Sequence, residues 1–226
     1  MTQAGPLQWR TGTGWLVLLG GGRWEENEII HSQVISAITD ESPIAFIPAA
    51  DPDPTRGEAF LSFYAELGAP QGYIVPIHDQ QSANEPANYR RLVNASLIYI
   101  GSGSARRLLE TLEGTAAIDA LATAFDGGAI IVGESAGASL LGKWGINTAQ
   151  GTVWPGWGWV SDAVITPHYT SEQTAQVRAA LQRYPEAIAL GIPAGVALAL
   201  GPDGELATWT DTDQQVTVTL GSKFGR

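Results

Sequence analysis

Cysteine is absent from this chain of 226 residues. Its absence excludes disulfide bonds, thiolate metal sites and a cysteine nucleophile, and with the last of these it excludes glutamine amidotransfer through a thiolate. Histidine is scarce as well, since the chain has only three. Any general base that titrates near neutral pH without a large pKa shift must come from this short set.

Basic residues are few: 12 Lys and Arg stand against 23 Asp and Glu, which gives a formal net charge of −11. A surface of this sign repels phosphate groups, so nucleic acid and anionic membranes are disfavoured partners. No apolar run reaches the roughly 18 residues needed to cross a bilayer. Residues 1–13 lack the basic and then apolar order of a secretory signal. We therefore expect a cytoplasmic protein.

The chain length fits one α/β domain over residues 1–226, and a hydrophobic content of 44% is ample for its core. Apolar segments alternate with segments of helical periodicity. Strands are expected at 15–19, 43–47, 73–77, 97–100 and 129–132, and helices at 28–39, 57–67, 87–94, 106–110 and 116–125. This alternation predicts a three-layer αβα fold in which helices cover both faces of a mostly parallel sheet.

The pattern changes after residue 141. A strand at 163–166, a helix at 173–183 and a strand at 187–192 are expected there. The segments 196–200, 206–209 and 216–220 follow, separated by turns, and they predict a small antiparallel C-terminal end. Trp154, Trp157 and Trp159 lie in a glycine-rich stretch, where we expect them to share one face, as core packing or as a wall of a substrate site.

The sequence Gly133-Glu134-Ser135-Ala136-Gly137 directly follows an apolar strand and precedes small residues that can begin a helix. Gly-x-Ser-x-Gly between a strand and a helix is the form of a nucleophile elbow, in which a strained turn exposes the serine. The first N–H groups of the following helix point back at the serine and can stabilise an oxyanion. The alternative is a tight turn in which Ser135 only caps the helix.

A serine nucleophile needs a general base, and the three histidines differ in position. His31 lies inside the first expected helix, where a surface or half-buried role is expected. His78 and His168 each follow an expected strand, and parallel strands carry their sites at their C-terminal ends. We expect His168 to be the base and keep His78 as the alternative. No two histidines have the spacing of metal ligands, so no metal and no cofactor are expected.

Two glycine-rich loops also follow expected strands, at 20–22 and 101–104. Neither has the complete Gly-x-Gly-x-x-Gly pattern, so nucleotide binding is a weak interpretation. A loop of small residues after a strand can instead offer a backbone N–H to an oxyanion. We expect Ser102 and Gly103 to form one donor region and the N–H of Ala136 to be the second donor.

Taken together, these segments resemble the serine peptidases of the cyanophycinase and dipeptidase E (α-aspartyl dipeptidase) family, which have a class I glutamine amidotransferase-like fold. The resemblance covers almost the whole chain. It rests on segments 20–22, 47–50, 64–69, 97–103, 133–138, 167–169 and 191–193. It implies Ser135 as the nucleophile, His168 as the base and the loop at Ser102 and Gly103 as part of the oxyanion hole. It also makes Gly21 and Gly22 candidates for substrate binding.

The chain departs from this family where substrate or the triad acid would be bound. Ala105, Gln150 and Ala194 stand where family members have polar or acidic side chains. The acid that orients the histidine is therefore unassigned. The candidates near the site are Glu134, next to the serine, and Glu172, which can equally belong to a capping box at 170–173. Asp162 is a third candidate, which the strand order places at the far end of its strand.

The sequence thus predicts a serine peptidase or amidase that cleaves small peptides through an acyl-enzyme on Ser135. The alternative is a non-catalytic relative that binds a peptide or metabolite in the same cleft. An α/β-hydrolase esterase is disfavoured, because only 33 residues separate Ser135 from His168 and that fold usually places its acid strand between them. A homodimer is a possible assembly. Because no arginine follows His168 closely, we expect weak preference for acidic substrate residues.

Overall fold

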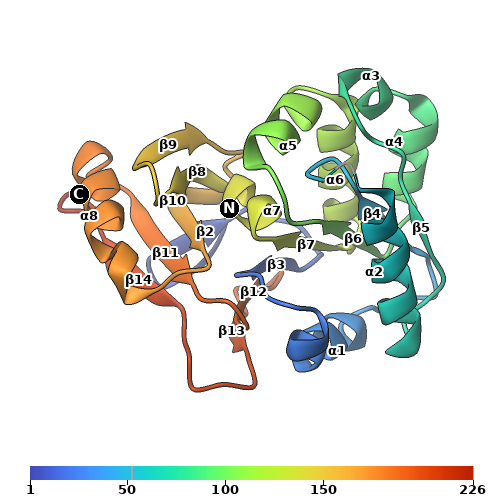
Figure 1. The fold of residues 1–226 in the computed structure, drawn as a ribbon, viewed down its shortest axis with the longest axis horizontal. Helices are drawn as coiled ribbons and strands as arrows, with labels where there is room; N and C mark the ends of the chain where they lie inside the picture. The colour runs from blue at the N-terminus through green and yellow to red at the C-terminus, as the bar shows by residue number, and fades with distance from the viewer. Residues whose placement is uncertain (52, 226) are drawn as a thin grey trace.

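The computed structural model describes residues 1–51 and 53–225. These residues form two seven-stranded sheets with helices around them (Figure 1). The order of the first sheet is β13 (Leu206–Trp209), β12 (Ala197–Leu200), β3 (Leu16–Leu19), β7 (Ile130–Glu134), β6 (Leu97–Ile100), β4 (Ile44–Ile47) and β5 (Gly72–Ile74). The five strands from β3 to β5 are parallel, whereas β12 and β13 are antiparallel to their neighbours.

Helices pack on both faces of this sheet, as its continuous apolar strands require. Alternate strand residues such as Val17 and Leu19 face the core under α1 (Glu28–Ser36) and α2 (Pro54–Glu66). Leu16 and Leu18 face the opposite core. The other helices are η1 (Glu25–Asn27), α3 (Gln80–Ala83), α4 (Pro86–Val93), α5 (Ala105–Leu112), α6 (Ala116–Asp126), α7 (Ala136–Leu141), η2 (Ser171–Gln173) and α8 (Thr174–Arg183).

The second sheet occupies the left of Figure 1, beside α8. Its order is β1 (Thr2–Ala4), β2 (Leu7–Trp9), β10 (Val160–Pro167), β11 (Ile188–Ile192) and β14 (Thr217–Leu220), and β10 also pairs with the hairpin of β8 (Gly142–Asn147) and β9 (Thr152–Pro155). Strands β10 and β11 are parallel. The α/β class with a mostly parallel main sheet is therefore confirmed.

Several details differ from the sequence prediction. The three C-terminal strands do not form one unit, because β12 and β13 extend the first sheet while β14 pairs with β11 in the second. The strands β1, β2, β8 and β9 were not predicted, since they are short and gain stability only through pairing with distant strands. The expected strand at 73–77 ends at Ile74. None of the helices among the described residues is both long and apolar enough to cross a membrane.

His31 is fully buried rather than at the surface, because the aromatic face of α2 covers it. Its Nδ1 lies 2.9 Å from the hydroxyl of Tyr64, and the rings of Phe63 and Tyr99 pack around it. Burial disfavours the charged imidazolium and lowers the pKa of His31 from 6.5 to about 4. The residue is a core histidine.

This burial predicts that the free energy of unfolding decreases as the pH falls from 6.5 toward 4. Over that range the unfolded chain binds a proton at His31, whereas the folded chain keeps the imidazole neutral. The free energy of unfolding therefore decreases by about 3 kcal/mol in total. Urea unfolding at several pH values should show this slope in the native chain and a smaller one in His31→Gln. The same substitution at exposed His78 is the control. Equal slopes in the native chain and His31→Gln would contradict the prediction.

Candidate active site

Ser135 occupies the sharp turn between β7 and α7. Its backbone has φ 50° and ψ −103°, a conformation that side chains rarely adopt. The turn is possible because two neighbours lack a Cβ: one at Gly137 would overlap the carbonyl oxygen of Ile100, and one at Gly133 would come within 2.7 Å of Gly137. The backbone N–H of Ser135 donates to the carbonyl of Leu19, at 3.0 Å. The predicted sequence of strand, turn and helix is present.

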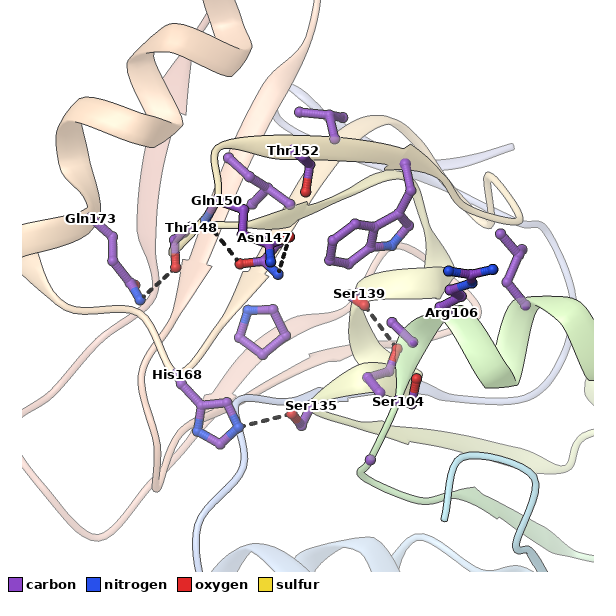
Figure 2. Close-up of a pocket in the computed structure, with 18 residues that line it drawn as sticks. Ser104, Arg106, Ser135, Ser139, Asn147, Thr148, Gln150, Thr152, His168 and Gln173 are labelled. Carbon is purple, nitrogen blue, oxygen red and sulfur yellow. Dashed lines mark hydrogen bonds between the residues drawn. The ribbon is translucent and has the colours of Figure 1, made fainter. Parts of the chain in front are cut away.

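His168 is brought to Ser135 from the second sheet, at the end of β10. The Oγ of Ser135 lies 2.8 Å from Nε2 of His168, as the dashed line in Figure 2 marks. The backbone of His168 also has a positive φ, of 52°, and its N–H donates to the carbonyl of Gly20, at 2.9 Å. His78, the alternative base, is exposed beyond β5 and does not line the cavity at Ser135.

Gly21 lies against the imidazole of His168. A Cβ at Gly21 would overlap the ring, and the φ of 101° at this position also favours glycine. Gly22 faces the side chain of Asn27 instead, and Nδ2 of Asn27 donates to the carbonyl of Gly21. Neither glycine lines the cavity. The structure therefore places Gly21 against His168 and outside the cavity, where an oxyanion or substrate contact had been expected.

Glu134 does not join the serine–histidine pair. It is 1% exposed, and its Oε2 accepts hydrogen bonds from the hydroxyl of Tyr99 at 3.0 Å and from the indole of Trp24 at 3.4 Å. The guanidinium of Arg56 lies 3.7 Å away. Burial raises the pKa of Glu134, and the positive charge of Arg56 opposes that shift. Glu134 is thus buried among these partners, and it is not the acid beside His168 that the sequence left open.

Glu172 is exposed in η2, and no ion pair with His168 is found among the described residues. The capping box of this turn joins Thr170 and Gln173, as the sequence suggested. Among residues 1–51 and 53–225, no carboxylate oxygen lies within 4.0 Å of a ring nitrogen of His168. Partial burial of the ring lowers the pKa of His168, and no charged partner offsets it.

A cavity of about 720 Å³ opens above Ser135 and His168. Its walls come from the start of α5, the elbow, the β8–β9 hairpin and the end of β10 (Figure 2). The lining residues are Gly103, Ser104, Ala105, Arg106, Leu109, Ser135, Ala136, Ser139, Ile146, Asn147, Thr148, Gln150, Thr152, Val153, Trp154, Pro167, His168 and Gln173. Within the described chain, no cluster of three or more His, Asp or Glu side chains could hold a metal ion.

Of the expected oxyanion donors, Gly103 and Ala136 line the cavity and Ser102 does not. The backbone N–H of Ser102 is directed to the carboxylate of Glu134. The loop that carries Gly103 is held in place by the N–H of Ser104, which donates to the carbonyl of Ala50 at 3.0 Å. Of the donor region predicted at residues 102–103, only Gly103 lines the cavity.

The sequence reasoning missed the contribution of the β8–β9 hairpin. Seven of the lining residues come from it, among them Thr148, Thr152 and Trp154. Trp157 and Trp159 do not line the cavity. All three tryptophans pack against the same hydrophobic core, so only Trp154 forms part of a cavity wall. The signal in the sequence is a pair of short apolar segments on either side of Asn147 and Gly151, a pattern that predicts a hairpin.

Comparison with known proteins gives a consistent result. The profile of Peptidase family S51 matches residues 16–205. Among solved structures, the chain is similar to a peptidase from an acI-B1 actinobacterium, with a TM-score of 0.71 and 19% identity over 93% of this chain and 96% of that one. It is also similar to a putative peptidase E protein from Listeria monocytogenes EGD-e, with a TM-score of 0.62 and 18% identity over 88% of this chain and 99% of that one. No curated protein matches.

The contact between Gly21 and His168 predicts that Gly21→Ala displaces the imidazole from Ser135. Because a displacement of about 1 Å can cost roughly a hundredfold in rate, any serine reactivity should fall by about that factor. The rate at which a fluorophosphonate modifies Ser135 is the measurement. Gly22→Ala is the matched control: it imposes similar backbone strain at φ 122° but faces Asn27. Equal losses in the two variants would show that strain, and not displacement of His168, is responsible.

Proposed function

The chain belongs to peptidase family S51, and we propose that it is a serine hydrolase that cleaves small peptides through an acyl-enzyme on Ser135. The observation that carries the proposal is the 2.8 Å contact between Oγ of Ser135 and Nε2 of His168 at the base of the cavity. A neutral imidazole in this position can accept the hydroxyl proton while the oxygen attacks a carbonyl carbon.

The proposed reaction has two halves. Oγ of Ser135 bonds to the peptide carbonyl carbon, and its proton passes to Nε2 of His168. The C–N bond then breaks, and His168 returns the proton to the leaving amine. In the second half a water loses its proton to His168, its oxygen attacks the ester, and the Oγ of Ser135 leaves with that proton. The backbone N–H groups of Gly103 and Ala136 would stabilise the oxyanion in both halves, because both residues line the cavity beside Ser135.

The missing carboxylate limits the expected rate. In a complete triad the acid fixes the tautomer of the histidine and stabilises the imidazolium, and its replacement can cost about 10⁴ in kcat. Here the backbone N–H of His168 donates to the carbonyl of Gly20, and Gly21 lies against the imidazole. These interactions position the residue but do not fix the tautomer of the ring or compensate a positive charge on it. We therefore propose a slow hydrolase.

The lack of a carboxylate beside His168 among the described residues also supports a second candidate function. A relative that has lost its triad acid can bind a peptide or metabolite in the cavity without cleaving it. The two functions differ in the reactivity of Ser135, because only the hydrolase needs an activated serine.

Labelling with a fluorophosphonate tests the hydrolase directly. We expect a single adduct, mapped by mass spectrometry to Ser135, and no adduct in Ser135→Ala. His168→Ala should slow the labelling by at least about a hundredfold, the typical contribution of a general base. Thermal unfolding of each variant serves as the control for folding. Undiminished labelling in His168→Ala would contradict the assignment of the base, and absence of labelling in the native chain would favour the binding function.

The lowered pKa of His168 predicts the pH dependence of the reaction. The base must be neutral, so kcat/KM should rise with pH, and the midpoint of the acid limb should lie below 6.5, the usual value for histidine. Glu172→Gln should leave this midpoint unchanged, because burial, and not the charge of Glu172, lowers the pKa of His168. A midpoint above 6.5 would instead indicate a negative charge beside the imidazole.

A further inference from the structure

The cavity above Ser135 has almost no charge in its walls. Among the lining residues that the structure describes, none carries a carboxylate, and Arg106 is the only one besides His168 that can carry a positive charge. The chain as a whole carries a net charge of −11. An anionic substrate group entering the cavity would therefore meet a repulsive field with little local compensation.

Arg106 is poorly placed to bind a substrate carboxylate. Its side chain is 87% exposed, and its Nε lies 2.7 Å from Oε1 of Glu110, one turn further along the same helix. Solvent screens a charge at this level of exposure, and Glu110 partly neutralises it. A strong carboxylate site usually has an arginine that donates two parallel hydrogen bonds from a fixed position. Arg106 lies at the rim without such support.

The walls instead combine neutral polar groups with apolar surface. The hairpin supplies the hydroxyls of Thr148 and Thr152, the carboxamide of Gln150 and the apolar side chains of Ile146 and Trp154, and Leu109 adds apolar surface from α5. Figure 2 shows Thr148, Gln150 and Thr152 on the side of the cavity opposite Ser135.

The tip of this hairpin is organised by its own hydrogen bonds. Oδ1 of Asn147 accepts from the backbone N–H groups of Ala149 at 3.0 Å and Gln150 at 3.2 Å. Gln173 links the tip to η2, because its Nε2 donates to the hydroxyl of Thr148 at 3.0 Å and its Oε1 accepts from the N–H of Thr170. These hydrogen bonds thus hold the uncharged side of the cavity, formed by Thr148, Gln150 and Thr152, in place before any ligand binds.

We propose that this cavity selects peptides whose residue on the acyl side of the scissile bond has an uncharged side chain, and that it discriminates against aspartate there. The inference rests on the proposed function, because it takes Ser135 as the point of attack and so defines the acyl side. Asparagine provides the sharpest comparison, since it has the shape of aspartate without the charge.

The test measures binding separately from cleavage. Ser135→Ala protein is titrated calorimetrically with the dipeptides Asn-Leu and Asp-Leu, which differ only in one amide against one carboxylate. We expect the Kd of Asn-Leu to be at least tenfold lower. In parallel, hydrolysis of both dipeptides by the native chain is followed by release of free leucine.

A second variant tests whether the local charge determines the selection. Gln150→Lys, introduced into Ser135→Ala, places a cation in the cavity wall and should reduce the ratio of the two Kd values at least fivefold. Gln182→Lys is the matched control, because Gln182 is exposed at the far end of α8 and makes the same change in net charge. The control should leave the ratio as it was.

The outcomes separate this inference from the proposed function. Equal or tighter binding of Asp-Leu, or binding of neither dipeptide, overturns the inference whatever the native chain cleaves. Selective binding of Asn-Leu without hydrolysis and without labelling of Ser135 supports the inference and overturns the proposed hydrolase. Equal effects of Gln150→Lys and Gln182→Lys would assign the discrimination to the net charge and overturn the role of the cavity wall.

Discussion

The site depends on how closely α7 approaches the first sheet. Gly133 and Gly137 allow this approach because a Cβ at either position would overlap neighbouring backbone. The approach forces Ser135 to a positive φ, a strain of about 1–3 kcal/mol that the surrounding structure must offset. Strand β7 does so, since all five of its residues are buried between β3 and β6. The core therefore holds the serine at the cavity, because relaxation of the turn would disrupt the packing of β7.

The end of β3 aligns both members of the serine–histidine pair. The carbonyl of Leu19 accepts the N–H of Ser135, and the next carbonyl, of Gly20, accepts the N–H of His168. Gly21 then leaves space for the imidazole. Three consecutive residues thus connect the two sheets at the point where the serine and the histidine meet. This alignment comes from the backbone and positions His168 without a carboxylate, but it does not stabilise a positive charge on the imidazole.

Sequence patterns predicted the elements that local signals define. The parallel strands, the turn at Ser135 and the position of His168 after a strand follow from apolar runs, glycine spacing and chain order. The pairing of β14 with β11 could not be predicted, because short strands carry no information about their distant partners. The same holds for Glu134, which is buried because Trp24, Arg56 and Tyr99 converge on it from three separate segments. No local pattern distinguishes such a residue from a solvated one.

The burial of Glu134 also bears on the chemistry at Ser135. The side chains of neighbouring strand residues point to opposite faces, and Glu134 follows Ile130 and Val132 onto the face covered by α1 and α2. Its partners there lie on the far side of the sheet from the cavity. A carboxylate on the cavity side would oppose the negative charge that develops on an oxyanion, whereas this one is compensated by Arg56 and by hydrogen bonds from Tyr99, Trp24 and the backbone N–H of Ser102. The fold thus keeps the carboxylate of Glu134 away from a cavity whose described lining residues include no carboxylate, and the serine, the imidazole and the backbone N–H groups must perform any chemistry there.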